Sequence, residues 1–159
     1  MHTPFFQEII ERFKLPWKFS AFNSYFVVVV IGFGGLGIFC RLYQVISGGE
    51  QHGYTIAQDM STYAMAIIAA SLVDLNLSLN ITSKPSLTIN SFAVGGISIL
   101  FMVLSYKIAS YWALVPGTIA VLLALLVWIL ANADNENLSD STYYEKMRGK
   151  DVGHGKNWK

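Results

Sequence analysis

The residues with the clearest chemical potential are two opposite charges within apolar stretches, Arg41 and Asp59. Arg41 lies about one turn before the end of the first stretch, and Asp59 lies near the start of the second. If the two stretches form antiparallel helices, both side chains reach a similar depth, which predicts an ion pair. A single charge within a membrane costs about 3 kcal/mol and is usually paired. The pair could mark a functional site or join two helices as a structural tether, and Glu50 is a second candidate partner for Arg41.

A glycine-rich run, Gly32-Phe33-Gly34-Gly35-Leu36-Gly37, matches the dinucleotide-binding pattern G-x-G-x-x-G. That site also needs a second strand ending at an acidic residue in a parallel sheet. The residues before Glu50 are too few and too rich in glycine to form that strand, so no dinucleotide site is expected. In a membrane helix, glycines let a second helix approach closely. The helix-packing surface is therefore predicted at Gly32, Gly34, Gly35 and Gly37.

Other arrangements that could support catalysis or bind metal are not found in the sequence. The three histidines, His2, His52 and His154, lie far apart and lack the spacing of metal ligands. No Ser/His/Asp or Cys/His set is brought together by the expected topology. The chain is therefore expected to be non-enzymatic, with no cofactor, no metal and no direct binding of nucleic acid.

The elements that must position these residues are apolar stretches of membrane length. Charged residues make up 13% of the 159 residues and hydrophobic residues 53%, whereas a soluble domain is about 25% charged. About 20 apolar residues cross the roughly 30 Å hydrocarbon core as a helix. The gaps between charges therefore predict an all-α membrane protein with four transmembrane helices, at residues 23–45, 56–75, 92–109 and 111–132.

The placement of lysine and arginine predicts the orientation of these helices. Nine of the eleven basic residues lie on one side of a four-span topology, and residues 47–58 on the other side contain none. Basic loops face the cytoplasm, so both termini are expected there, in a bacterial inner membrane. Residues 133–159 would form a cytoplasmic tail. Residues 1–22 would form an amphipathic segment at the membrane surface, or else a short helix packed on a soluble partner.

Residues 75–90 have a different pattern from the spans. From residue 73 to residue 82 apolar and polar side chains alternate strictly, which is typical of a strand. A turn signal follows at Ser83-Lys84-Pro85-Ser86, and the alternation then resumes. The pattern predicts a cytoplasmic β-hairpin between spans two and three. The alternative is that the second span continues as a helix beyond Asp74.

The second span is the most polar of the four and has a small-residue face. Its polar side chains include Gln58, Ser61, Thr62 and Ser71, with alanines between them. Such a face could line a pore, or it could pack against neighbouring helices.

The cytoplasmic side offers more surface for recognition than the outer side. It carries the N-terminal segment, residues 75–90 and a tail with mixed charge, whereas the outer side has one short loop and a tight turn. Aromatic and basic side chains are common anchors in protein interfaces. A cytoplasmic protein partner is therefore expected to dock on Tyr143, Tyr144, Lys146, Arg148 and Trp158.

The layout of four predicted spans, short loops and a charged tail resembles the small membrane subunits of bacterial anti-phage systems, such as that of the Kiwa system. The resemblance implies a homo-oligomer that reports an event at the cell envelope to a soluble effector. The chain is thus expected to be an oligomeric membrane scaffold or sensor in contact with lipid. The alternative is a small channel or membrane-disrupting effector lined by the second span.

Overall fold

The computed structural model is helical through most of the residues it describes, which are 4–48, 53–79, 85–133, 135 and 138. The all-α class predicted from the sequence is therefore confirmed for this part of the chain. Two short segments are 3-10 helices, η1 and η3, and one, η2, is a π-helix. In chain order the elements are α1 (Pro4–Lys14), η1 (Pro16–Lys18), α2 (Ser20–Tyr25), η2 (Phe26–Phe33), α3 (Leu36–Ile46), α4 (Gly53–Leu79), α5 (Pro85–Lys107), η3 (Tyr111–Ala113) and α6 (Leu114–Ala131).

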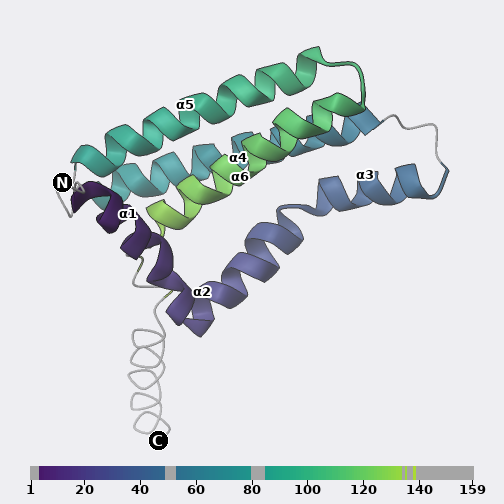
Figure 1. Cartoon of the computed structure of the whole chain (residues 1–159). Coiled ribbons are helices and arrows are strands. Elements are labelled where there is room, and N and C mark those ends of the chain that lie inside the picture. Colours follow the sequence, from purple (N-terminus) through teal and green to yellow (C-terminus); the bar gives the residue numbers. More distant parts are fainter. Residues whose placement is uncertain (1–3, 49–52, 80–84, 134, 136–137, 139–159) are drawn as a thin grey trace, which may run out of the picture.

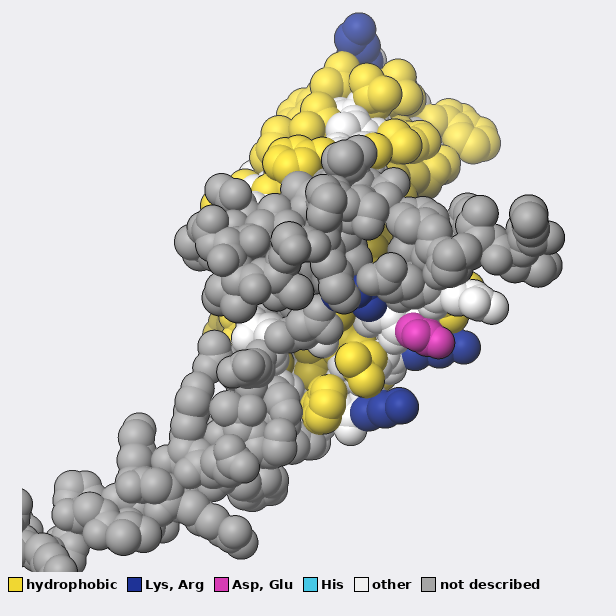
Figure 2. Space-filling view, turned by 90° about the vertical axis from the view of Figure 1, so that its left-hand side faces the viewer, with side chains coloured by type: hydrophobic (Ala, Val, Ile, Leu, Met, Phe, Trp, Pro, Cys, Tyr) yellow, Lys and Arg dark blue, Asp and Glu magenta, His cyan; other side chains and the backbone are white. Residues whose placement is uncertain are grey.

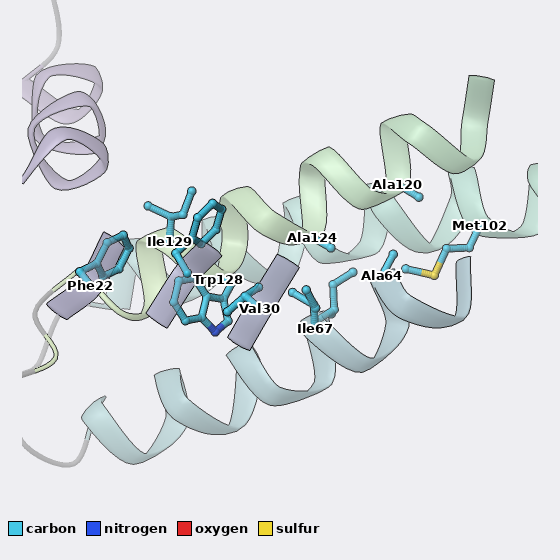
Figure 3. Packing of buried hydrophobic residues seen from close by; sticks show 11 residues of the cluster. Phe22, Val30, Ala64, Ile67, Met102, Ala120, Ala124, Trp128 and Ile129 are labelled. Atoms are coloured by element: carbon cyan, nitrogen blue, oxygen red, sulfur yellow. The ribbon is translucent and has the colours of Figure 1, made fainter. Parts of the chain in front are cut away.

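Helices α4, α5 and α6 lie side by side and form what we call the bundle (Figure 1). The segment made of α2, η2 and α3, residues 20–46, lies on the side of the bundle away from α5, and we call it the arm. Figure 3 shows the buried hydrophobic side chains that join the two parts. Ala64, Met102 and Ala124 pack within the bundle, and Phe22 and Val30 of the arm lie near Trp128 of α6.

Within the described residues, two helices are long and apolar enough to cross a membrane, Tyr54–Asp74 and Tyr111–Ala131. They coincide with the predicted spans at residues 56–75 and 111–132. A third span is obtained if the pair Ile10–Lys18 and Ser20–Phe33, which bends by 93°, counts as one. The remaining apolar helices are shorter, Leu36–Ile46 and Ser91–Lys107. Two to three membrane-spanning helices are thus compatible with the fold.

The predicted first span, residues 23–45, is not one regular helix. It begins in α2, continues as the π-helix η2 and changes to α3 at Gly34 and Gly35. Four consecutive valines lie within it, at residues 27–30. Their β-branched side chains are restricted in χ1 in an α-helix, which lowers their helix propensity. The glycines then weaken the helical backbone at the junction. The first span therefore has an irregular backbone where the sequence predicted a continuous helix.

The β-hairpin predicted at residues 75–90 is wrong where the structure describes the chain. Helix α4 continues to Leu79 and α5 begins at Pro85, so residues 75–79 and 85–90 are helical. Residues 80–84 lie outside the described part. Leucine, which supplies the apolar positions at the end of α4, is a strong helix former. An isolated two-stranded hairpin is also only marginally stable, so helix continuation is favoured over the period-two pattern.

Exposed apolar side chains cover much of the outer surface of α5. Phe92 and Leu100 are 56% and 64% exposed, and Val103 is exposed as well. Figure 2 shows hydrophobic side chains gathered over the upper part of the molecule, where α5 lies in Figure 1. A soluble domain of this size rarely exposes such a continuous apolar surface, which is typical of contact with lipid or a partner.

Gly117 of α6 lies at a close approach of α6 to α4 and α5. A Cβ atom added there would lie 3.3 Å from Oγ of Ser105 and 3.4 Å from Cα of Ala57. The first distance is tighter than most Cβ contacts and the second is at the limit of ordinary contact, so a side chain larger than a methyl group is expected to push α6 away from α4 and α5. Small residues in membrane helices commonly serve this purpose.

Replacing Gly117 with leucine is therefore expected to lower the free energy of unfolding by about 2 kcal/mol, the cost of overpacking. The measurement is denaturation of the purified protein in detergent, followed by circular dichroism. Gly96→Leu is the matched control, because a Cβ atom at Gly96 meets no atom within 4 Å. Equal losses in the two variants would contradict the assignment of Gly117 as a close-packing position.

Candidate functional site

A cleft of about 400 Å³ lies between the arm and the bundle. Ligand sites in proteins commonly measure about 300–1,000 Å³. The α4 residues that line the cleft recur every three or four positions, so they form one stripe along that helix. From Asp59 to Ala70 this stripe is about 16 Å long at 1.5 Å per residue. The lining consists of Val30, Gly34, Gly37, Ile38, Asp59, Thr62, Tyr63, Ala66, Ile67, Ala70 and Trp128.

The structure brings together the two charges singled out in the sequence. The Nε atom of Arg41 on α3 donates a hydrogen bond to Oδ2 of Asp59 on α4, at 2.9 Å. Nη1 of Arg41 also donates to the side-chain oxygen of Gln44, at 3.4 Å. The two charged side chains are 32% and 29% exposed, so the pair is partly shielded from solvent. A charge-assisted bond of this kind is stronger than a neutral one, and here it fastens α3 to one end of the cleft.

The second candidate partner of Arg41, Glu50, lies outside the described residues.

A second contact fastens the arm where the π-helix ends. The N–H of Gly34 donates to the carbonyl of Val29, five residues back, whereas the N–H of Gly35 donates to Ile31, four residues back. The carbonyl of Val30, which lies between these two acceptors, therefore receives neither of the two N–H groups. The hydroxyl of Tyr63 on α4 donates to that oxygen at 2.7 Å. The side chain of Tyr63, on another helix, thus gives the Val30 carbonyl a hydrogen bond that neither glycine N–H provides.

The glycines of the predicted packing surface have separate environments in the chain. A Cβ atom on Gly34 would lie 2.8 Å from the ring of Tyr63, so Gly34 lets the arm approach α4. At Gly32 and Gly35 an added Cβ would meet atoms of the arm itself, and at Gly37 it would meet no atom within 4 Å. Only Gly34 among the four thus permits a close helix approach within one chain. Contact of the others with a second copy stays a prediction.

Aromatic rings fasten the start of the arm to the end of α6. The ring of Trp128 lies 5.5 Å from that of Phe22, 5.6 Å from that of Phe26 and 6.0 Å from the ring of Tyr25, on which it stacks. Trp17 of η1 completes the cluster at 5.1 Å from Phe26. Offset and edge-to-face aromatic pairs each add about 1 kcal/mol beyond the area they bury. The arm is therefore held at three places: this aromatic cluster, Tyr63 and the ion pair.

Sequence reasoning did not identify the roles of Tyr63 and Trp128. Each lies in a predicted span, where sequence alone does not distinguish an aromatic residue with a specific contact from ordinary core. A signal for Tyr63 was present in principle, because a phenol inside a span needs a hydrogen-bond partner.

Part of the polar face of the second span is buried against other helices in the described structure. Within α4, Ser61 donates to the carbonyl of Ala57 at 2.9 Å, and Ser71 donates to that of Ile67 at 2.7 Å. Ser105 of α5 reaches the same Ala57 carbonyl at 3.3 Å. All three serines are buried. Of the two interpretations of this face, pore lining and packing, the contacts within one chain favour packing.

The expected docking residues of the tail lie outside the described residues. They are Tyr143, Tyr144, Lys146, Arg148 and Trp158. In the described ranges no group of three metal-binding side chains comes together. Searches against protein-family models, curated proteins and solved structures found no match to this chain.

Proposed function

We propose that the chain is a non-enzymatic, oligomeric membrane scaffold or sensor that docks a cytoplasmic protein. In this proposal it crosses the bacterial inner membrane four times, and both termini lie in the cytoplasm. The observation that carries the proposal is the attachment of the arm to a closely packed bundle at three separate contacts. A rigid body with a separately fastened element suits a protein that holds a partner or responds to its surroundings.

The chemistry of the cleft supports a binding role over a catalytic one. Its ionisable side chains are Asp59 and Tyr63. Asp59 accepts a hydrogen bond from Arg41, and Tyr63 donates to the carbonyl of Val30. A general base or nucleophile must instead reach the substrate. The resemblance of the layout to membrane subunits of anti-phage systems suggests that the docked partner acts in defence against phage.

Removal of residues 145–159 tests the docking element. The truncated chain is expected to insert and assemble like the full chain, but to lose co-purification with its cytoplasmic partner and protection against phage. Tyr144→Ala alone is expected to weaken docking about tenfold, as for an interface anchor. The measurements are plaque counts and co-purification from cells that also express the neighbouring genes.

The control separates protein docking from attraction to anionic lipid. Lys156→Ala removes a basic residue at the end of the tail and should leave docking within about twofold if the aromatic anchors dominate. Lipid attraction would fade with added salt and would tolerate Tyr144→Ala. Full protection by the truncated chain would contradict the proposal. Depolarisation or dye leakage on expression would instead favour the alternative, a channel or membrane-disrupting effector.

A further inference from the structure

The polar and apolar residues of the cleft are segregated along its length. Asp59, Thr62 and Tyr63 lie toward one end of the stripe on α4, and Ala66, Ile67 and Ala70 continue it. Across from them the arm contributes mostly small or apolar residues. The cleft therefore has one polar end and a longer apolar part, which is the polarity of an amphiphile.

The dimensions of the cleft fit one extended hydrocarbon chain. Its stripe on α4, about 16 Å long, is close to half of the roughly 30 Å hydrocarbon core, which is the length available to the chains of one leaflet. The side chains of Ala66 and Ala70 are small, and Gly37 has none, so these positions leave space in the cleft between the arm and the bundle. A cleft of about 400 Å³ is large enough for a small ligand.

Asp59 lines the polar end of the cleft, and Arg41 lies beside it as its ion-pair partner. Together the two charges complement a headgroup that itself carries both signs. The guanidinium of Arg41 and the carboxylate of Asp59 are 2.9 Å apart, and about a third of each side chain is exposed. A phosphate would be attracted to the former and an ammonium group to the latter. We infer that the cleft holds one acyl chain of a zwitterionic phospholipid, with its headgroup at the Arg41–Asp59 pair. The inference rests on the proposed membrane location and adds a ligand to the proposed scaffold.

Two substitutions fill the cleft from opposite walls. A side chain at Gly37 has open space, since an added Cβ meets no atom within 4 Å, so Gly37→Leu should occupy the cleft without moving α3. Ala66→Phe fills the cleft from α4, where Ala66 is exposed. Gly96→Leu is the matched control, because Gly96 also has open space but lies on α5, away from the cleft.

The test uses the full chain in nanodiscs of phosphatidylcholine that contain a small fraction of phosphatidylethanolamine with a photoreactive diazirine in one acyl chain. After illumination, the crosslinked residues are mapped by mass spectrometry. We expect strong labelling of Ala66, Ile67 and Ala70 above the level at Leu100 on the outer face of α5. Gly37→Leu and Ala66→Phe should each lower cleft labelling about tenfold, whereas Gly96→Leu should leave it unchanged.

The outcomes distinguish this inference from the proposed function. Labelling of Leu100 without enrichment in the cleft, or cleft labelling that both filled variants retain, would overturn the acyl-chain site and leave the docking proposal standing. Absence of labelling at both places would overturn the membrane location and the site together. Loss of phage protection on tail removal is independent of these measurements.

Discussion

Replacing Asp59 with alanine is expected to lower the free energy of unfolding by about 3 kcal/mol. The substitution removes the carboxylate that Nε of Arg41 contacts at 2.9 Å, and removing one partner of a shielded ion pair costs much more than the pair itself contributes. The arm should separate from α4 at the Arg41 end of the cleft. The measurement is detergent-induced denaturation of the purified chain, with helicity and tryptophan fluorescence as two independent signals.

The double variant Arg41→Met with Asp59→Leu should recover most of that loss, because apolar residues of similar size often replace an ion pair shielded from water without cost, and this pair is partly shielded. Asp74→Asn is the control on the same helix: Asp74 is exposed, and its substitution should change the free energy of unfolding by less than about 0.5 kcal/mol. If the double variant were no more stable than Asp59→Ala, the loss would come from something other than the uncompensated charge.

Replacing Tyr63 with phenylalanine is expected to cost about 2 kcal/mol and to loosen the backbone locally. The ring stays, but the hydroxyl that donates to the carbonyl of Val30 at 2.7 Å is lost. A buried carbonyl without its partner costs about 1–3 kcal/mol. Hydrogen exchange should accelerate at the amides of Gly34 and Gly35, where the backbone spacing changes. The measurement is amide exchange followed by mass spectrometry in nanodiscs.

Tyr106→Phe is the matched control for this effect. The hydroxyl of Tyr106 also contacts α4, but its bonds to Thr62 and to the carbonyl of Gln58 are longer, at 3.3 Å and 3.5 Å, and the residue is exposed. It should leave the exchange at Gly34 and Gly35 unchanged. Faster exchange along all of α4 in Tyr63→Phe would indicate general destabilisation and contradict a local role at the junction.

The predictable parts of the fold depend on features that can be read along the sequence, such as the length of a charge-free stretch or the position of an isolated charge. A charge-free stretch of about 20 residues has few alternatives to a long buried or membrane helix, and α6 lies where such a stretch predicted it. The contact between Arg41 and Asp59 was predictable for a related reason. Each is an isolated charge in an apolar segment, where an unpaired charge is costly. Few opposite charges lie at a similar depth, so the partner could be chosen from the sequence.

Other features depend on contacts that no local pattern specifies. The alternation around residues 75–79 suggested a strand, but these residues extend α4, which reaches Leu79. Adding residues to an existing helix outweighs the period-two pattern of the side chains. The π-helix depends on where the hydrogen-bond spacing shifts, and Tyr63 stabilises that point from more than thirty residues away. Sequence spacing indicates the helices, and tertiary contacts determine their irregularities.

The junction between five-residue and four-residue hydrogen-bond spacing also sets the direction in which α3 faces. Each residue in an α-helix turns the chain by about 100°. A residue in five-residue spacing turns the chain by less than a residue in α-helical spacing, so moving the junction would rotate the side chains of α3, Arg41 included, about the helix axis relative to Asp59. The hydrogen bond at Val30 and the ion pair therefore depend on the same rotational phase of α3. Losing that phase would release the arm at both contacts at once, while the aromatic cluster would still hold its start against α6.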